Sequence, residues 1–250
     1  MDIEPNQNTS IELAVIIPVY NEEEVISAVL REWHLTLNKL KINFEIHAYN
    51  DGSNDNSLII MNEISDNLDR LIVHDKENSG HGPTILKGYR ENLDAEFIFQ
   101  VDSDNEMSHE DFFKIWEYRE KADFILGQRD GRVSNLSRKI ISWVSRVSVC
   151  ILYSNKVHDV NTPYRLMRSK IFKKYWQNIP EDTLAPNVII SGIAGLINCR
   201  IVELPIKHTY RATGDVSIQK FKLLRFAIIA LFQTVTSRTM FSKWKYICSF

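Results

Sequence analysis

The chain has 250 residues, of which 44% are hydrophobic and 25% charged, and its formal net charge is −2. This length has room for one large α/β domain or two small ones, and the composition is that of an ordinary globular core with a polar surface. The polar N-terminus, MDIEPNQNTS, lacks the apolar stretch of a secretory signal peptide.

Strand and helix patterns alternate through the first half of the chain. The β-branched run Leu13–Val19 predicts a buried strand, and further strands are predicted at 44–49, 71–74, 97–101 and 124–126. Helices are predicted at 22–40, from Pro83 onward, and after Ser108, which forms an N-cap pattern with Asp111. Strands separated by helical crossovers predict a mostly parallel sheet with helices on both faces, which binds ligands at the carboxyl ends of its strands.

The second half of the chain is less regular. Apolar spacing predicts a helix over 137–153, then a turn and short strand over 159–168, a strand over 201–206 and an apolar helix over 221–235. Cys150, Cys199 and Cys248 form no CxxC pair, which favours a reducing compartment. We expect an α/β domain over 1–215 and an amphipathic, basic and aromatic helical tail over 216–250.

The tail differs in charge from the rest of the chain. Residues 207–250 include eight basic residues and one acid, Asp215. A basic tail on an acidic body indicates a negatively charged partner, such as phospholipid, a phosphorylated ligand or nucleic acid. The tail's helical apolar stripe consists of Phe221, Leu224, Ile228, Leu231 and Val235.

The composition of the tail predicts how the protein contacts a membrane. Residues 238–250 mix basic and aromatic side chains, as expected at a lipid–water boundary, but the apolar run 226–237 is shorter than the roughly 20 residues that span a bilayer. We expect a cytoplasmic protein in peripheral contact with an anionic membrane. The alternatives are packing on the main domain or a homo-oligomer interface, and no nucleic-acid-binding module is recognisable.

The segment Asp102-Ser103-Asp104-Asn105-Glu106 is the most informative one for chemistry. It follows a predicted buried strand, and its three carboxylates repel one another unless a cation or hydrogen-bond donors offset their charge. Carboxylates suit Mg²⁺ or Mn²⁺, which would bridge the oxygens of a diphosphate. The alternative is a solvated acidic turn that caps the next helix.

Three more polar segments follow predicted strands. Asn50 and Asp51 form an Asx-type turn or accept hydrogen bonds from a nucleobase or ribose. In Pro18-Val19-Tyr20-Asn21-Glu22, Tyr20 could stack on a base and Glu22 could hydrogen-bond to it. Arg129 either binds a phosphate through two hydrogen bonds or forms a surface ion pair.

Taken in order, these segments resemble the family 2 glycosyltransferases, which have the GT-A fold. The segments are AVIIPVYNEEE, NDGSNDNS, ENSGHGPTILKGY, VDSDNE, ILGQR, DVNTPYRLMR and HTYRATGDVS. Within that family the chain is most similar to the branch of dolichol-phosphate mannose synthase and the bacterial polyprenyl-phosphate glycosyltransferases.

The resemblance implies an inverting, nucleotide-sugar-dependent hexosyltransferase that uses Mg²⁺ or Mn²⁺. It assigns nucleotide-sugar contacts to Pro18, Tyr20, Glu22, Asn50, Asp51, Asp102, Ser103 and Arg129, and metal contacts to Asp102, Asp104 and Glu106. It assigns catalysis to Asp159, Asp104 and Arg211, and the acceptor side to Arg165 and Arg211. The implied partners are a UDP- or GDP-linked sugar and a polyprenyl phosphate or glycan acceptor.

Three positions depart from the family pattern. Asn50 stands where the family usually has Asp, so the base preference is open. Pro163 and Tyr164 replace a Ser-Gly-Phe sequence and stiffen the acceptor-side turn. A lysine often found after Gly-x-Ser is missing, although Lys220 is near.

The role of Asp159 depends on the acceptor. A sugar hydroxyl needs a general base, for which Asp159 is the candidate, whereas a lipid phosphate is already an anion and needs cationic positioning. In the second case Asp159 could orient Arg165 or Arg211, or form a structural ion pair.

Two other function classes are weighed against this one. A nucleotidyltransferase would share the sheet and the acids but would want a glycine-rich basic loop after the first strand, where this chain is acidic. A non-catalytic binding protein would not need the intact acidic segment together with Arg129.

Overall fold

The computed structural model describes residues 10–130, 136–153, 157–208 and 220–247. The strands are β1 (Leu13–Val19), β2 (Phe44–Asp51), β3 (Leu71–Lys76), β4 (Phe97–Gln100), β5 (Phe124–Asp130), β6 (Arg165–Arg168) and β7 (Ile201–Lys207). The helices are α1 (Ile26–Asn38), α2 (Ser57–Ser65), α3 (His81–Glu91), α4 (Phe112–Glu117), α5 (Leu136–Tyr153), α6 (Ser169–Trp176), α7 (Pro186–Leu196) and α8 (Lys220–Ile247); a 3₁₀ turn, His109–Asp111, precedes α4.

Within the described ranges, the strands form one seven-stranded sheet in the order β3-β2-β1-β4-β6-β5-β7. Only β6 runs antiparallel to its neighbours, and the other pairs are parallel. The predicted mostly parallel sheet is therefore confirmed. The carboxyl ends of β1, β2, β4 and β5 lie along the same edge, where the sequence places its polar segments.

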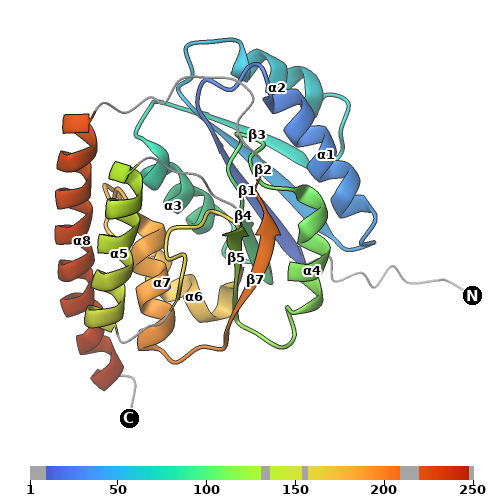
Figure 1. Ribbon diagram of the computed structural model, residues 1–250. Coiled ribbons are helices and arrows are strands. Elements are labelled where there is room, and N and C mark those ends of the chain that lie inside the picture. The colour runs from blue at the N-terminus through green and yellow to red at the C-terminus, as the bar shows by residue number, and fades with distance from the viewer. Residues whose placement is uncertain (1–9, 131–135, 154–156, 209–219, 248–250) are drawn as a thin grey trace, which may run out of the picture.

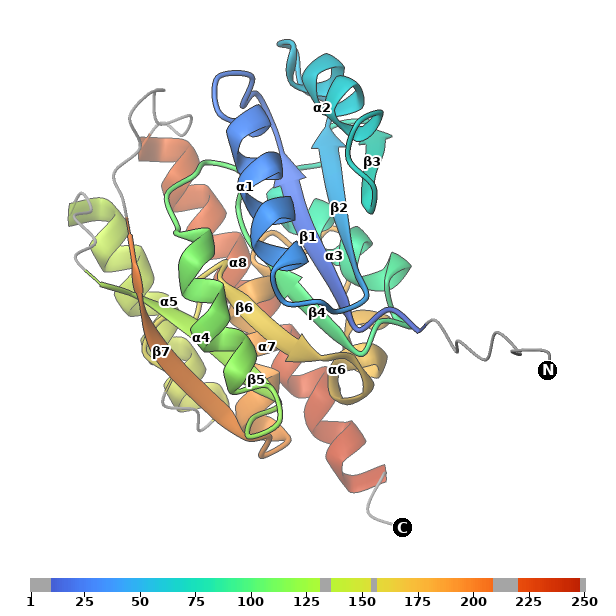
Figure 2. The same cartoon turned by 90° about the vertical axis from the view of Figure 1, so that its right-hand side faces the viewer.

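Helices cover both faces of the sheet. Helices α1, α2 and α4 lie on one face and α3, α5, α6, α7 and α8 on the other (Figures 1 and 2). All seven residues of β1 are buried, as expected for a β-branched strand between two helical layers. Helix α3 packs closely on β1, because a Cβ at Gly88 would lie 2.5 Å from Cγ2 of Ile16.

Most of the predicted elements are present, with shifted ends. Helix α1 starts four residues later than predicted, at Ile26, because Glu22 and Glu23 are held by hydrogen bonds to residues 55–57, between β2 and the start of α2. Ser108 caps the 3₁₀ turn through the Glu110 amide, at 3.2 Å, but its expected partner Asp111 instead accepts from the Lys207 amide at 2.7 Å. The predicted helix at 221–235 and part of the segment after it are one helix, α8.

Over its whole length α8 has apolar residues on both its buried and its exposed sides, so the amphipathic character predicted for the tail is not confirmed. It packs against α5 and α7 (Figure 1). The Tyr153 hydroxyl donates to the Thr234 carbonyl at 2.9 Å, and the Leu184 amide donates to the Gln233 side chain at 2.9 Å. No helix in the described residues is long and apolar enough to cross a membrane.

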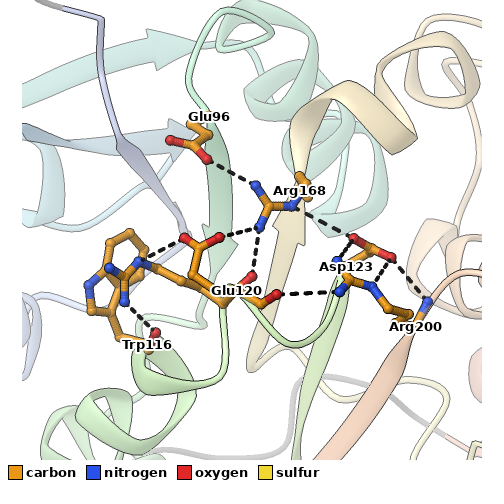
Figure 3. Close-up of polar contacts among 7 residues, drawn as sticks. Glu96, Trp116, Glu120, Asp123, Arg168 and Arg200 are labelled. Carbon is orange, nitrogen blue, oxygen red and sulfur yellow. Dashed lines mark hydrogen bonds and ion pairs between the residues drawn. The ribbon is translucent and has the colours of Figure 1, made fainter.

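A charged network closes the amino-terminal edge of the sheet (Figure 3). Arg168, at the end of β6, pairs with Glu96 at 2.9 Å and with Glu120 at 3.3 Å. Asp123, just before β5, accepts from Arg200 at 2.8 Å and lies 3.7 Å from Arg168. Hydrogen bonds and charge from Arg200 hold the pKa of Asp123 below its usual value. The acids at this edge are thus neutralised by arginines.

Candidate functional site

Two loops interlock at the carboxyl ends of β1 and β2. The Asn21 amide donates to the Ser53 hydroxyl at 3.0 Å, and the Asn54 amide donates back to the Asn21 side chain at 2.8 Å. The Glu22 amide donates to the Ser57 hydroxyl at 2.8 Å. Asn21 has a positive φ of 54°, which an Asn accepts more readily than most residues. These contacts fix the loop that carries Tyr20 and Glu22.

Asp51 is held by three donors. Both of its carboxylate oxygens accept backbone hydrogen bonds, from Ser79 at 2.8 Å and from Gly80 at 2.9 Å, and Lys76 forms an ion pair with it. Asp51 is 3% exposed and lines the cavity described below. The turn before α3 is therefore anchored to the end of β2.

Asn50 points elsewhere. Its amide donates to Asp75 on the neighbouring strand β3 at 2.7 Å, and its oxygen accepts from the Ser53 amide at 3.3 Å. It is 1% exposed and does not line the cavity. A carboxylate at this position could not donate to Asp75 and would repel it. The Asn in place of the usual Asp thus has a local structural reason.

A cavity of about 400 Å³ lies at the carboxyl ends of β1, β2 and β4. Its lining brings together seven of the predicted site residues: Pro18, Tyr20, Glu22, Asp51, Asp102, Ser103 and Asp104. The lining also includes Asn78, Gly80 and His81, from the turn that leads into α3. The Tyr20 ring is 42% exposed and available at the rim.

The acidic segment after β4 carries excess negative charge. Asp102 accepts from His81 at 2.9 Å, Glu106 pairs with His208 at 3.1 Å, and Asp104 accepts from the Glu106 amide at 3.1 Å. Burial, followed by the charges of Asp102 and Glu106, raises the pKa of Asp104 to about 7. In the described part of the chain, no three His, Cys, Asp or Glu side chains already form a metal cluster.

Arg129 and Asp159 form a two-point ion pair at the end of β5. Asp159 accepts from Arg129 Nε at 2.7 Å and from Nη2 at 2.9 Å, and the side chains are only 20% and 9% exposed. Glu203 holds the loop that carries Asp159, because it accepts a hydrogen bond from the His158 amide at 2.9 Å. Arg129 does not line the cavity. Asp159 pairs with Arg129 and not with Arg165, one of the two arginines considered from the sequence.

Arg165 lies inside the protein. It is fully buried and donates to the backbone carbonyls of Thr162 at 2.6 and 2.9 Å, of Asn187 at 3.1 Å and of Val160 at 3.3 Å. Burial lowers its pKa to about 10. In this arrangement its guanidinium holds the loop at 159–165 and has no surface for an acceptor. Arg211 lies outside the described residues.

Residues 14–176 match the family profile described as Glycosyl transferase family 2. The chain belongs to this family.

Two curated relatives share a name. This family 2 chain is 25% identical, over 216 residues, to the undecaprenyl-phosphate 4-deoxy-4-formamido-L-arabinose transferase of Proteus mirabilis (strain HI4320), covering 85% of this chain and 64% of that protein. It is 24% identical over 230 residues to the protein of the same name from Salmonella choleraesuis (strain SC-B67), with coverage of 91% and 67%. The chain thus spans about two thirds of the length of these relatives.

Solved structures support the GT-A fold. Glucosyl-3-phosphoglycerate synthase from Mycobacterium tuberculosis, in complex with Mn²⁺, UDP and glucosyl-3-phosphoglycerate, gives a TM-score of 0.64 at 11% identity and covers 96% of this chain and 87% of its own. S. aureus TarS in complex with UDP-GlcNAc gives a TM-score of 0.58 at 20% identity, with coverage of 88% and 66%. The GT-A fold expected from the resemblance is confirmed.

Sequence reasoning missed His81 as a site residue of this family 2 chain. The signal was available: Asn78-Ser79-Gly80-His81-Gly82 follows a strand whose carboxyl end lies at the edge that carries the other site residues. The structure places His81 in the cavity, bonded to Asp102, at the start of α3.

Proposed function

We propose that this chain transfers a sugar, with inversion, from a nucleotide diphosphate sugar to a polyprenyl phosphate. The observation that carries the proposal is the cavity at the carboxyl ends of β1, β2 and β4, which joins Tyr20 and Asp51 to Asp102 and Asp104. The curated relatives named for undecaprenyl-phosphate transfer support the acceptor. The neighbours solved with UDP and UDP-GlcNAc support a UDP-linked donor.

The donor would lie across this cavity. Its base would reach the Tyr20 ring and the Asp51 carboxylate, which has one lone pair left on Oδ2 beyond its three donors. Its diphosphate would lie toward Asp102 and Asp104. The helix dipole of α3 and the His81 side chain face the same cavity and favour an anion there.

The acidic segment fits a divalent cation by its chemistry. Asp102 and Asp104 both line the cavity, and burial, followed by the charges of Asp102 and Glu106, raises the pKa of Asp104. Mg²⁺ or Mn²⁺ takes a small number of carboxylates and completes its coordination with phosphate oxygens. Such an ion would neutralise charge on the departing nucleoside diphosphate. Asp102 and Asp104 would hold it, and Glu106 would support it from beside His208.

The ion pair between Asp159 and Arg129 fits a phosphate acceptor, because such an acceptor needs no general base. In the transfer, an acceptor phosphate oxygen forms a bond to the anomeric carbon while the bond from that carbon to the diphosphate breaks. The attacking oxygen is already anionic, so no proton has to be removed. Both oxygens of Asp159 accept from Arg129, so Asp159 holds a guanidinium in place and does not stand free as a base.

Calorimetric binding of UDP- and GDP-sugars, with and without Mn²⁺, tests the donor site. We expect the wild type to bind one donor only when metal is present, and Asp104→Asn to lose that binding. Asp94→Asn is the matched control, because that carboxylate is fully exposed on the surface. If no donor binds under any metal condition, the transferase proposal is wrong.

A second measurement tests the acceptor. Transfer to undecaprenyl phosphate should fall about tenfold or less in Asp159→Asn, because the acceptor needs no base. A hydroxyl acceptor that relied on Asp159 as its general base would lose on the order of 10²–10⁴-fold. If the wild type instead transfers to a sugar hydroxyl and not to undecaprenyl phosphate, and Asp159→Asn loses that transfer by this factor with donor binding intact, the acceptor is a sugar hydroxyl of a growing glycan.

A further inference from the structure

Helix α8 exposes apolar side chains and buries polar ones. Phe232 and Ile228 are 68% and 61% exposed, whereas Thr234 and Ser237 are 2% and 3% exposed. A helix on the surface of a protein that meets only water has the opposite pattern. The exposed side chains recur at helical spacing and continue through Leu231 and Val235. They therefore form a stripe that needs an apolar environment.

Helix α5 has the same feature and lies beside α8 (Figures 1 and 2). Trp143 and Ile151 are 63% and 74% exposed, although both are large and apolar. The two helices are 66 residues or more apart in sequence, so no local constraint forces both to expose such residues. We call this surface the α5/α8 face; its residues are Trp143, Ile151, Ile228, Leu231, Phe232 and Val235.

An apolar cavity of about 200 Å³ lies between α5, α7 and α8. Val144 and Ser148 line it from α5, Val188 from α7, and Ile228 and Leu231 from α8. The last two also belong to the α5/α8 face, so the cavity reaches that face. A cavity of this lining offers water few hydrogen bonds and is better filled by hydrocarbon.

The positive charge of α5 and α8 indicates which partner covers the α5/α8 face. Neither helix sequence contains Asp or Glu, and all their charged residues are basic: Arg138, Lys139, Arg146, Lys220, Lys222, Arg225, Arg238, Lys243 and Lys245. Two copies of this chain meeting through this face would bring like charges together, which is unfavourable. Anionic phospholipid headgroups would instead attract it, at about 1 kcal/mol for each basic residue near the surface.

We propose that the α5/α8 face docks on an anionic lipid bilayer. The six apolar side chains enter the boundary between headgroups and acyl chains, the exposed Arg146 and Arg225 meet lipid phosphates, and the cavity takes up part of a hydrocarbon chain from the bilayer. The α5/α8 face is preformed, because hydrogen bonds hold α8 in place. The Leu184 amide donates to the Gln233 side chain, and the Tyr153 hydroxyl donates to the Thr234 carbonyl. The docking is independent of the donor site and does not require the proposed transfer.

Vesicle cosedimentation of the full chain tests this proposal. We expect binding to vesicles of phosphatidylethanolamine and phosphatidylglycerol, little binding to pure phosphatidylcholine, and loss at high salt. Phe232→Ser and Trp143→Ser should each lower the partition coefficient about tenfold or more. Leu35→Ser and Ile59→Ser are matched controls, because these residues are 62% and 57% exposed on α1 and α2, and they should bind as the wild type does.

Three outcomes would overturn the proposal. The first is vesicle binding that the Phe232 and Trp143 variants retain. The second is equal binding to neutral vesicles. The third is a dimer in sedimentation velocity that Phe232→Ser abolishes, which would make the face an interface between copies. Calorimetric donor binding, measured on the same variants without lipid, keeps a failed docking distinct from a failed donor site.

Discussion

Acidic side chains have different partners at the two ends of the parallel strands, here called the amino edge and the carboxyl edge of the sheet. At the amino edge, Asp123 lies between Arg168 and Arg200, and its pKa is lowered (Figure 3). At the carboxyl edge, no Arg or Lys among the described residues pairs with Asp102 or Asp104, and the pKa of Asp104 is raised to about 7. The first arrangement stabilises the fold. The second stores repulsion that a cationic ligand would relieve, which is typical of a binding site.

The largest expected effect is the loss of transfer activity in Asp104→Asn. If Asp102 and Asp104 hold a cation that serves the diphosphate, kcat/KM should fall roughly 10³-fold, because a ligand of the ion that stabilises developing charge is removed. Steady-state kinetics with a saturating acceptor would measure it. The same variant should unfold at a temperature no lower than the wild type in metal-free buffer. Retention of activity would show that Asp104 is only part of an acidic turn.

Arg168→Met at the opposite edge should give the reverse result. Its side chain is 9% exposed and serves Glu96, Glu120 and Asp123 together. Removing the guanidinium leaves Asp123, which is 12% exposed, with Arg200 as its remaining partner, while Glu96 and Glu120 are more than half exposed, so the free energy of unfolding should fall by about 1–2 kcal/mol. Urea denaturation would measure the fall. The donor dissociation constant should not change; a weaker donor affinity would show that the two edges are coupled.

The pH dependence of stability should report the raised pKa of Asp104 at the carboxyl edge of the sheet. The raised pKa of Asp104 means that the folded protein holds a proton that the unfolded chain releases near its ordinary pKa of 3.8. Metal-free stability should therefore fall as pH rises from about 4 to 7, by on the order of 2 kcal/mol. Denaturation curves at several pH values would show this slope. The slope should shrink in Asp104→Asn, and Mn²⁺ should offset it in the wild type; the same slope in the variant would contradict this account.

The sequence allowed the sheet and most residues that line the cavity at the carboxyl ends of its strands to be predicted. Leu13–Val19 is an uninterrupted β-branched run, and polar residues that follow parallel strands must meet at one edge. Partners that depend on strand order could not be predicted. Asn50 bonds to Asp75 only because β2 lies beside β3.

The acceptor side shows the same limit of sequence reasoning. Among the described strands, Arg165 belongs to the one antiparallel strand, β6. No local sequence signal predicts that β6 lies between β4 and β5. The Arg165 guanidinium is therefore buried inside the protein, which the sequence did not indicate. Helix α7 was also not predicted, because it is buried on nearly every side and shows no helical alternation of apolar and polar residues.

The smallest expected effect concerns a histidine pair on β2 and β3, remote from both acidic groups. His47 Nδ1 lies 3.0 Å from His74 Nε2, and the flanking charged groups are Glu45, Glu91 and Lys87. Burial lowers the pKa of both rings, and the charge of His74 lowers that of His47 further.

Since the unfolded chain protonates near pH 6.5, stability from the histidine pair is present above that pH and is lost as pH falls below it. This slope has the opposite sign to that of Asp104, so the two can be separated in Asp104→Asn. Thermal unfolding between pH 5 and 7.5 in that background should give a slope that replacing both histidines by Gln removes. A slope unchanged by that double replacement would mean that other groups set the acid limit of the fold.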